Sequence, residues 1–160
     1  MSVRLRPLRE DEYDAFYADA VEQYAFDLEE NGGFTREHAR RKSVADHERT
    51  LTDGLATPDT FLRVVEDADG RRVGIVWWAI QTSQVGVRRA YLYAIAIDEP
   101  ERGRGLGRAT MLGLEDEVRA HGLDRIELNV FGGNEVARGL YRSLGYAESA
   151  VYMVKSLPRA

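Results

Sequence analysis

The sequence contains no cysteine, which excludes disulfide bonds, thiolate metal sites and a cysteine nucleophile. Its three histidines, His38, His47 and His121, are scattered and leave little material for a zinc site. No apolar run approaches the roughly 18 residues of a membrane-spanning helix. The first ten residues also lack the apolar core of a signal peptide, so we expect a soluble, cytoplasmic protein without a metal.

The composition suits one folded domain. A length of 160 residues is that of a single ordinary domain, so we predict one domain over residues 1–160. The hydrophobic share of 44% is enough for a core. The net charge of −5 argues weakly against nucleic-acid binding, for which a basic face is expected. We therefore expect neither a nucleic-acid nor a membrane partner.

The first 60 residues are predicted to be mainly helical. Residues 3–8 resemble a short strand, and apolar residues then recur at spacings of three and four over residues 13–28. That spacing predicts an amphipathic helix, which ends at the Asn-Gly-Gly of residues 31–33. A second helix is predicted to begin at Thr35 and to run to about Leu55.

The central part of the sequence predicts strands. Residues 60–66 and 73–82 flank a turn and predict a hairpin. The third strand, residues 90–97, is almost wholly apolar, which predicts burial on both faces at the centre of a sheet. Trp77 and Trp78 are adjacent on a strand and must point to opposite faces. One is expected in the core, and the other in an acceptor cleft or a partner interface.

The last part of the sequence alternates helices and strands. A glycine-rich loop precedes a helix that ends near residue 120, residues 125–130 predict a strand, and Asn134 begins a further helix. One or two more strands are predicted within residues 146–157. Hairpins followed by crossover helices predict an α/β fold, a mixed sheet of six to seven strands with about four helices on both faces.

Residues 102–108, Arg-Gly-Arg-Gly-Leu-Gly-Arg, are the most informative segment. They lie between a predicted strand and a predicted helix, where glycines let the backbone come close to a ligand. Free N–H groups and the dipole of the following helix attract an anion, and three arginines add positive charge. The segment therefore predicts a site for a phosphate-bearing ligand. The alternative is an ordinary glycine-rich turn with solvated arginines.

Two common nucleotide motifs do not fit this loop. The dinucleotide pattern G-x-G-x-x-G fails because Gly103 and Gly105 are followed by Gly107, one residue too early. The G-x-x-x-x-G-K-[ST] pattern requires a lysine, and the loop contains none. These two nucleotide sites are disfavoured.

The loop does resemble the R/Q-x-x-G-x-G/A motif of the GNAT superfamily of acyl-CoA-dependent N-acyltransferases, with Arg102 first and Gly107 last. Residues 95–101 are similar to that family's fourth strand. Residues 134–146 are similar to its N-x-x-A-x-x-L-Y-x-x-x-G-F segment. The resemblance is strong from about residue 90 to residue 146 and is only an outline before residue 60. It implies a splayed sheet whose strands 90–97 and 125–130 part at a cleft.

The resemblance implies transfer of an acetyl group from acetyl-CoA, as cosubstrate, to a primary amine. The amine attacks directly through a tetrahedral intermediate, whose oxyanion a backbone N–H near Ile95 or Ala96 stabilises. The pantetheine arm is expected to pair with the backbone of Ile95 and Ile97 like an added strand. The full set of implied cofactor-binding residues is Ile95, Ala96, Ile97, Arg102, Gly103, Arg104, Gly105, Leu106, Gly107, Arg108 and Asn134. For Asn134, the alternative of a plain helix N-cap is compatible with that role.

The resemblance also implies that Tyr141 is the general acid that protonates the departing thiolate. The alternative is that Tyr141 only fills the apolar face of its helix. The general base stays unassigned, because residues 90–97 contain no carboxylate. One candidate is Glu127, and another is Tyr93 acting through water. The remaining candidates are Glu29 and Glu30, at the end of the first predicted helix.

The acceptor side is suggested by charge. Residues 10–30 carry nine carboxylates and no lysine or arginine, which would attract a cationic amine. The alternative is an ordinary solvated helix face. The acceptor class stays open between a small molecule and a peptide or protein, and a homodimer is compatible with the fold.

Two other functions compete with the enzyme. One is an acyl-CoA-binding sensor of the same fold without turnover, which the missing carboxylate on residues 90–97 favours. The other is a nucleotide-binding protein of another fold, which preferential binding of ATP or NAD would support. Release of free thiol with a panel of amines separates enzyme from sensor.

Overall fold

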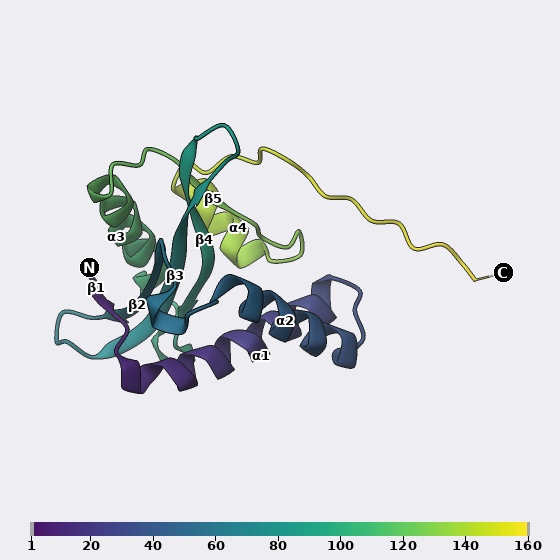
Figure 1. Cartoon of the computed structure of the whole chain (residues 1–160), viewed down its shortest axis with the longest axis horizontal. Helices are drawn as coiled ribbons and strands as arrows, with labels where there is room; N and C mark the ends of the chain where they lie inside the picture. The colour runs from purple at the N-terminus through teal and green to yellow at the C-terminus, as the bar shows by residue number, and fades with distance from the viewer. Residues whose placement is uncertain (1, 160) are drawn as a thin grey trace.

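The computed structural model describes residues 2–159 and contains one mixed sheet with the strand order β1-β2-β3-β4-β5. The first four strands are antiparallel neighbours, whereas β5 is parallel to β4. The predicted mixed α/β architecture is therefore confirmed (Figure 1). The elements are β1 (Arg4–Pro7), α1 (Tyr13–Asn31), α2 (Arg36–Thr50), β2 (Thr60–Glu66), β3 (Arg72–Thr82), β4 (Arg88–Ile97), α3 (Leu106–Ala120), β5 (Ile126–Leu128) and α4 (Glu135–Ser143).

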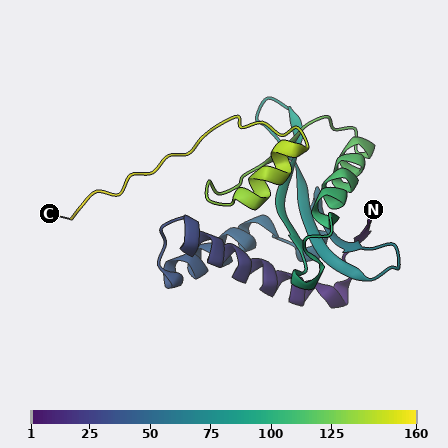
Figure 2. The ribbon, with the colours of Figure 1, turned by 180° about the vertical axis from the view of Figure 1, so that it is seen from behind.

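Helices cover both faces of the sheet, as predicted. The paired helices α1 and α2 lie on one side, and α3 and α4 lie on the other (Figures 1 and 2). Trp77 packs with Phe16 of α1, whereas Trp78 belongs to the larger cluster that contains Met111 of α3. The opposite orientation of the two tryptophans is thereby confirmed. The expectation that one of them reaches a cleft or a partner is wrong, because helices cover both faces of the sheet and bury both rings. A helix suited to crossing a bilayer is absent from residues 2–159.

The two N-terminal helices begin where the sequence predicts, but the second is shorter. The hydroxyl of Thr35 accepts a hydrogen bond from the backbone N–H of His38 at 3.3 Å and caps α2. The helix ends at Thr50 rather than at about Leu55. Gly54, at φ 54°, adopts a left-handed conformation and begins a separate 3₁₀ turn there, so the α-helix cannot continue.

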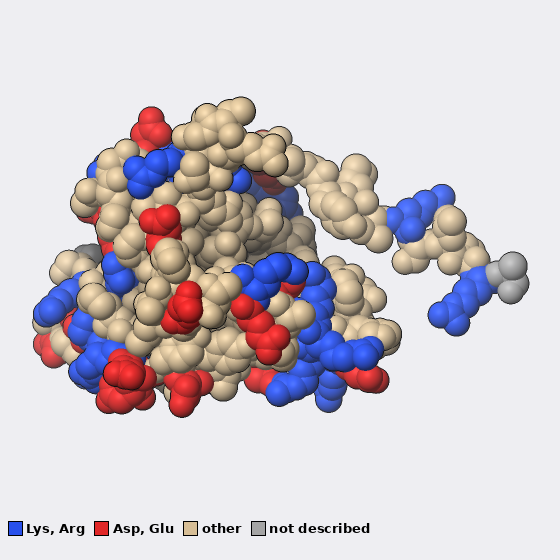
Figure 3. Space-filling view, in the orientation of Figure 1, with Lys and Arg blue, Asp and Glu red and all other residues tan. Residues whose placement is uncertain are grey.

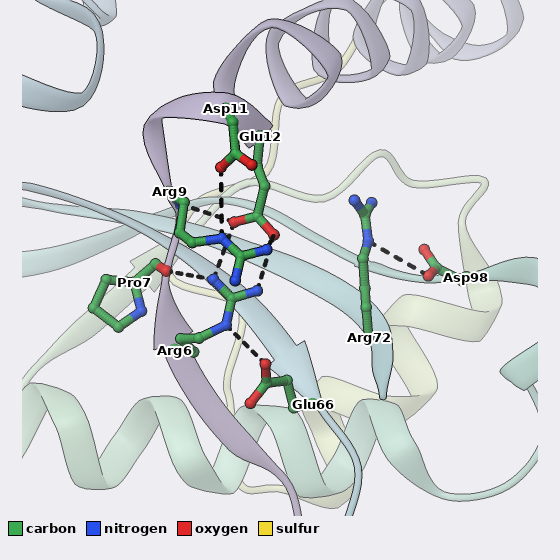
Figure 4. Close-up of polar contacts among 8 residues, drawn as sticks. All are labelled: Arg6, Pro7, Arg9, Asp11, Glu12, Glu66, Arg72 and Asp98. Atoms are coloured by element: carbon green, nitrogen blue, oxygen red, sulfur yellow. Dashed lines mark hydrogen bonds and ion pairs between the residues drawn. The ribbon is translucent and has the colours of Figure 1, made fainter. Parts of the chain in front are cut away.

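An arginine network fixes the start of α1 against the sheet (Figure 4). Arg6 of β1 donates two hydrogen bonds of 3.0 Å to Glu12 and one of 2.7 Å to Glu66 of β2. The backbone N–H of Arg9 adds a bond of 2.8 Å to Glu12. These donors favour the charged carboxylate and lower the pKa of Glu12 to about 2.

The predicted strands within residues 146–157 are wrong. The structure has no strand between residues 144 and 159, and the sheet has five strands instead of six or seven. The chain leaves the body after α4 and runs outward in an extended form (Figures 1 and 2). A segment becomes a strand only when its backbone groups pair with another strand, and the apolar pattern of residues 146–157 does not determine which sheet edge is available for pairing.

The predicted burial of the third strand is correct for only part of its length. In β4, Ala90 and Leu92 are buried, whereas Tyr93 is 36% exposed and Ala96 is also exposed. Residues 93–97 are therefore an apolar stretch that pairs with β3 on one edge and lacks β5 on the other. That stretch is where the candidate site lies.

Candidate active site

Strands β4 and β5 pair over three residues only and then part. Ala90, Tyr91 and Leu92 of β4 lie opposite residues 126–128, where β5 ends. On its other side, β4 continues to pair with β3 as far as Ile97. The second half of β4 therefore has a partner on one edge and an open edge on the other, which is the splay that the resemblance to the GNAT superfamily implies.

A β-bulge at Tyr93 marks the boundary between the two halves. Ala94 lies opposite Trp77 and Leu92 opposite Trp78, so Tyr93 is an extra residue on β4. The bulge interrupts the alternation of the strand. As a result, Leu92 and Ile95 both pack into the cluster beneath α3, although three positions separate them.

The open edge of β4 presents the backbone of Ile95 and Ile97. The N–H of Asp98 donates to Val73 O of β3 at 2.9 Å, and backbone groups alternate between the two edges of a strand. The N–H and C=O groups of Ile95 and Ile97 therefore face away from β3. The carbonyl of Ile97 already accepts a hydrogen bond from Arg102 Nε at 3.0 Å.

The glycine-rich loop follows directly and has the geometry of an anion site. Gly103 and Gly105 adopt φ of 76° and 77°, a left-handed conformation that favours glycine. Gly105 precedes α3 and supplies no side-chain cap. The N–H groups of Leu106, Gly107 and Arg108 therefore have no acceptor within the helix and lie at its positive end.

The three loop arginines surround this helix end, but each also binds a protein group. Besides the bond of Arg102 to β4, Arg104 forms an ion pair with Glu101. Arg108 donates to Ser143 Oγ of α4 at 2.9 Å and so connects the two helices. The arginines contribute positive charge while their guanidinium groups hold the loop in shape.

Helix α4 contacts the start of α3. The side-chain oxygen of Asn134 accepts a hydrogen bond from Ala137 N–H at 3.1 Å, so Asn134 caps α4. A Cβ added at Gly107 would lie 3.4 Å from a methyl carbon of Leu140. The loop, the start of α3 and α4 therefore form one continuous surface.

Tyr141 lies on α4 and packs against the same core cluster as Ile95 and Ile97. Its side chain is half-buried, and burial raises the pKa of the Tyr141 phenol. No residue among 2–159 forms a hydrogen bond with its hydroxyl. The ring centre of Tyr146 lies 5.8 Å from that of Tyr141. The Tyr146 hydroxyl is buried without a hydrogen-bond partner, and burial raises the pKa of Tyr146 to about 12.

Two of the carboxylates considered as general base are engaged in ion pairs. Glu127 lies 2.6 Å from Arg89 and 2.8 Å from Arg125. Glu29 pairs with Arg36 at 3.4 Å. Both carboxylates therefore already have cationic partners within the protein. Glu30 is exposed at the end of α1.

A polar and aromatic lining lies on the α1–α2 side of the splay and consists of Gln81, Tyr91, Tyr93 and Asn129. Of these four residues, only Tyr93 was considered from the sequence. The Tyr93 ring stacks on Trp77 at 4.6 Å, and its hydroxyl accepts a hydrogen bond from Gln81 at 3.0 Å. The Tyr91 hydroxyl accepts one from Asn129 at 2.7 Å, and burial raises the pKa of Tyr91. Gln81, Tyr91 and Asn129 belong to or follow different strands, so only the pairing of those strands reveals the group.

The acidic segment of residues 10–30 is partly neutralised. Besides the contacts of Glu12 and Glu29, Glu22 forms an ion pair with Arg40 of α2. Asp27 is half-buried, and burial raises its pKa. Figure 3 shows red and blue groups interspersed over α1 and α2, and a largely uncharged hollow between these helices and the part that carries α4. The interspersed charges favour the solvated-face interpretation over a strong acidic field.

Comparison with known proteins identifies relatives of the whole chain. The model of the acetyltransferase (GNAT) family matches residues 6–146. The uncharacterized N-acetyltransferase YdgE of Bacillus subtilis is 28% identical over 98% of this chain and 99% of its own length. The crystal structure of YycN from Bacillus subtilis superposes with a TM-score of 0.92 at 26% identity, covering 99% of this chain and all of that one.

A second group of relatives is similar over part of the chain. The mycothiol acetyltransferase of Beutenbergia cavernae is 35% identical over 101 residues, which are 63% of this chain and 33% of that protein. This similarity covers only a third of the longer relative, so it bears on one region of that protein.

Proposed function

Because this chain belongs to the acetyltransferase (GNAT) family, we propose that it transfers the acetyl group of acetyl-CoA to a primary amine. The observation that carries the proposal is the open edge of β4 at Ile95 and Ile97, which leads directly into the loop of residues 102–108. An acyl-CoA carries an extended arm with two amides between its thioester and its pyrophosphate. A strand edge followed by an anion site matches these two parts in order.

The residues present fit both parts of this ligand. The N–H and C=O of Ile95 and the N–H of Ile97, which face the open edge, can pair with the amides of the arm, as in strand addition. The unpaired N–H groups at the start of α3 can bind the pyrophosphate. Gly103 and Gly105 carry no Cβ that would hold the ligand away from this backbone.

The reaction forms a C–N bond between the amine and the acetyl carbonyl carbon, breaks the C–S bond, and yields an amide and a free thiol. We assign Tyr141 to protonate the sulfur. In water, a phenol has a pKa of about 10 and a thiol one of about 8.5, so complete transfer to a free thiolate is uphill. Donation is therefore coupled to C–S cleavage. The raised pKa of Tyr141 keeps its phenol protonated at neutral pH, the form that a donor needs.

We propose that the amine approaches from the α1–α2 side, past Tyr91, Tyr93 and Asn129. These side chains offer hydroxyl and amide groups that can hold water. With Glu127 and Glu29 in ion pairs, the ammonium proton leaves through such water rather than directly to a carboxylate. This assigns no single residue as the general base.

The test is release of free thiol from acetyl-CoA in the presence of a panel of amines. The panel includes small amines, peptides and mycothiol-related amines, the last because of the partial similarity to mycothiol acetyltransferases. The proposal expects thiol release above background with at least one amine. Acetyl-CoA binding without turnover would instead support the sensor function. Binding of ATP or NAD in preference to CoA would contradict both.

A further inference from the structure

Residues 149–157, beyond α4, are mostly apolar and are all exposed. Val151 is 70% and Tyr152 93% exposed, and Met153, Val154 and Leu157 are exposed to a similar degree. In Figure 3 this segment projects from the body as uncharged atoms, with basic groups only towards its end. Four consecutive apolar residues are typical of a strand buried on both faces, so water is an unfavourable environment for residues 149–157.

The sheet offers an edge that such a strand would complete. The N–H of Ala90 donates to Arg125 O at 2.9 Å, and the alternation of a parallel pair then turns the backbone of Ile126 and Leu128 away from β4. β5 is the last strand of the sheet, so nothing among residues 2–159 pairs with these groups. An open edge of this kind is a ready template for another strand.

The chain is held in a direction that leads the segment away from its own β5. Gly145, at φ 91°, turns the backbone, and Tyr146 N–H donates to Tyr141 O at 3.0 Å. Glu148 then accepts hydrogen bonds from Arg138 at 2.8 Å and Arg142 at 3.0 Å, both on α4. Beyond this clamp the chain extends outward in both views (Figures 1 and 2).

From these three observations we infer that two copies of this chain exchange their C-terminal segments. Residues 149–157 of each copy form a strand on the β5 edge of the other. Nine extended residues span about 30 Å, enough to cross a two-fold interface. The exchange is reciprocal, so one symmetric contact covers both apolar segments and both open edges. The inference concerns assembly and is independent of the proposed acetyl transfer.

Light scattering coupled to size-exclusion chromatography of the full chain tests the inference. A dimer is expected for the native sequence, and Met153→Asp should raise its dissociation constant at least tenfold. Ser149→Asp adds the same charge in the same segment but keeps every apolar side chain, and it should remain a dimer. Because Met153 is 86% exposed, the monomer fold should survive the substitution.

A second pair of variants tests the β5 edge. Leu128→Pro removes the outward backbone N–H of residue 128. Leu128→Ala shortens the side chain to a similar extent but keeps that N–H. The dissociation constant of the dimer should be higher for Leu128→Pro than for Leu128→Ala. A native chain that is monomeric at 100 µM, or a dimer that resists both Met153→Asp and Leu128→Pro, would overturn the inference.

Amide hydrogen exchange distinguishes pairing between copies from pairing within one chain. In the exchanged dimer, residues 151–157 should be protected at high protein concentration, and the protection should fall on dilution. Protection that does not depend on concentration would mean that the segment folds back on its own β5, which also overturns the inference.

Discussion

The two halves of β4 differ in what lies along their edges. Residues 90–92 are paired on both edges, and Ala90 and Leu92 are buried there. Residues 93–97 are paired with β3 alone, and Tyr93 and Ala96 are exposed. Pairing with β5 ends at Leu92, next to the β-bulge at Tyr93. Thus an apolar strand can be core at one end and a binding edge at the other.

The difference has a physical origin in hydrogen bonding rather than in hydrophobicity. Where β5 is present, the backbone groups of β4 are paired and offer nothing to a ligand. Where β5 has ended, Ile95 and Ile97 keep their side chains in the core while their backbone groups face the opening. The open half therefore combines rigid support with free donors and acceptors, which is what a strand-adding ligand requires.

The largest effect is expected beside the open half, from Tyr141→Phe. This change keeps the ring and its packing and removes the acidic proton. We expect a fall of about 10²-fold in turnover, the range for lost acid catalysis, with little change in the KM for acetyl-CoA. The melting temperature should hold, because the hydroxyl has no bonded partner among residues 2–159. Steady-state kinetics and thermal unfolding on one preparation check both points.

Tyr146→Phe is the matched control. It removes a hydroxyl that is buried without a partner, so stability should hold or rise and turnover should be unchanged. The pH profile adds a further check. Because the pKa of Tyr141 is raised, the alkaline loss of activity that its deprotonation causes should lie above pH 10. Full activity of Tyr141→Phe would remove this residue from the chemistry.

The next effect is expected at the loop, from Gly105→Val. A side chain at φ 77° is strained, and it also stands where a pyrophosphate would approach the backbone. CoA affinity should weaken at least tenfold, about 1.4 kcal/mol, by calorimetry. Gly86→Val, at φ 81° in the β3–β4 turn, imposes similar strain at the far end of β4. It should lower stability without changing CoA affinity, and equal affinities for the two variants would refute the loop assignment.

A smaller effect is expected from the open edge itself. Ile95→Pro removes an N–H that does not bond to β3, and Ile95→Ala removes packing while keeping that N–H. We expect CoA to bind Ile95→Pro about three- to tenfold more weakly than Ile95→Ala, as for the loss of one hydrogen bond. A calorimetric titration of both variants measures the difference. Equal binding would mean that this N–H does not contact the ligand.

The smallest effect is expected in the closed half, from Glu127→Gln. Its ion pairs with Arg89 and Arg125 are partly exposed, so their loss should cost no more than about 1 kcal/mol of unfolding free energy. Because Glu127 is engaged in these pairs, turnover should change less than twofold. If turnover instead fell about 10²-fold while stability stayed normal, Glu127 would be identified as the general base.

The elements that sequence predicts well are those decided locally. The end of α1 at residues 31–33 and the cap at Thr35 follow from nearby residues. The opposite faces of Trp77 and Trp78 follow from strand geometry alone.

The features that sequence misses depend on partners distant along the chain. The last apolar segment was predicted to join the sheet, but its strand partner is not determined by its own pattern. The lining formed by Gln81, Tyr91 and Asn129 arises only after three strands are aligned. Likewise, the open edge of β4 depends on where β5 stops.

The most direct test of the account is amide hydrogen exchange along β4 with and without saturating acetyl-CoA. The N–H groups of Ile95 and Ile97 face the opening, so their exchange should be fast in the free protein and slow at least tenfold on binding. The N–H of Leu92 faces β5 and should be protected in both states. If calorimetry shows binding and the exchange of Ile95 and Ile97 is unchanged, acetyl-CoA does not pair with this edge and the central claim is wrong.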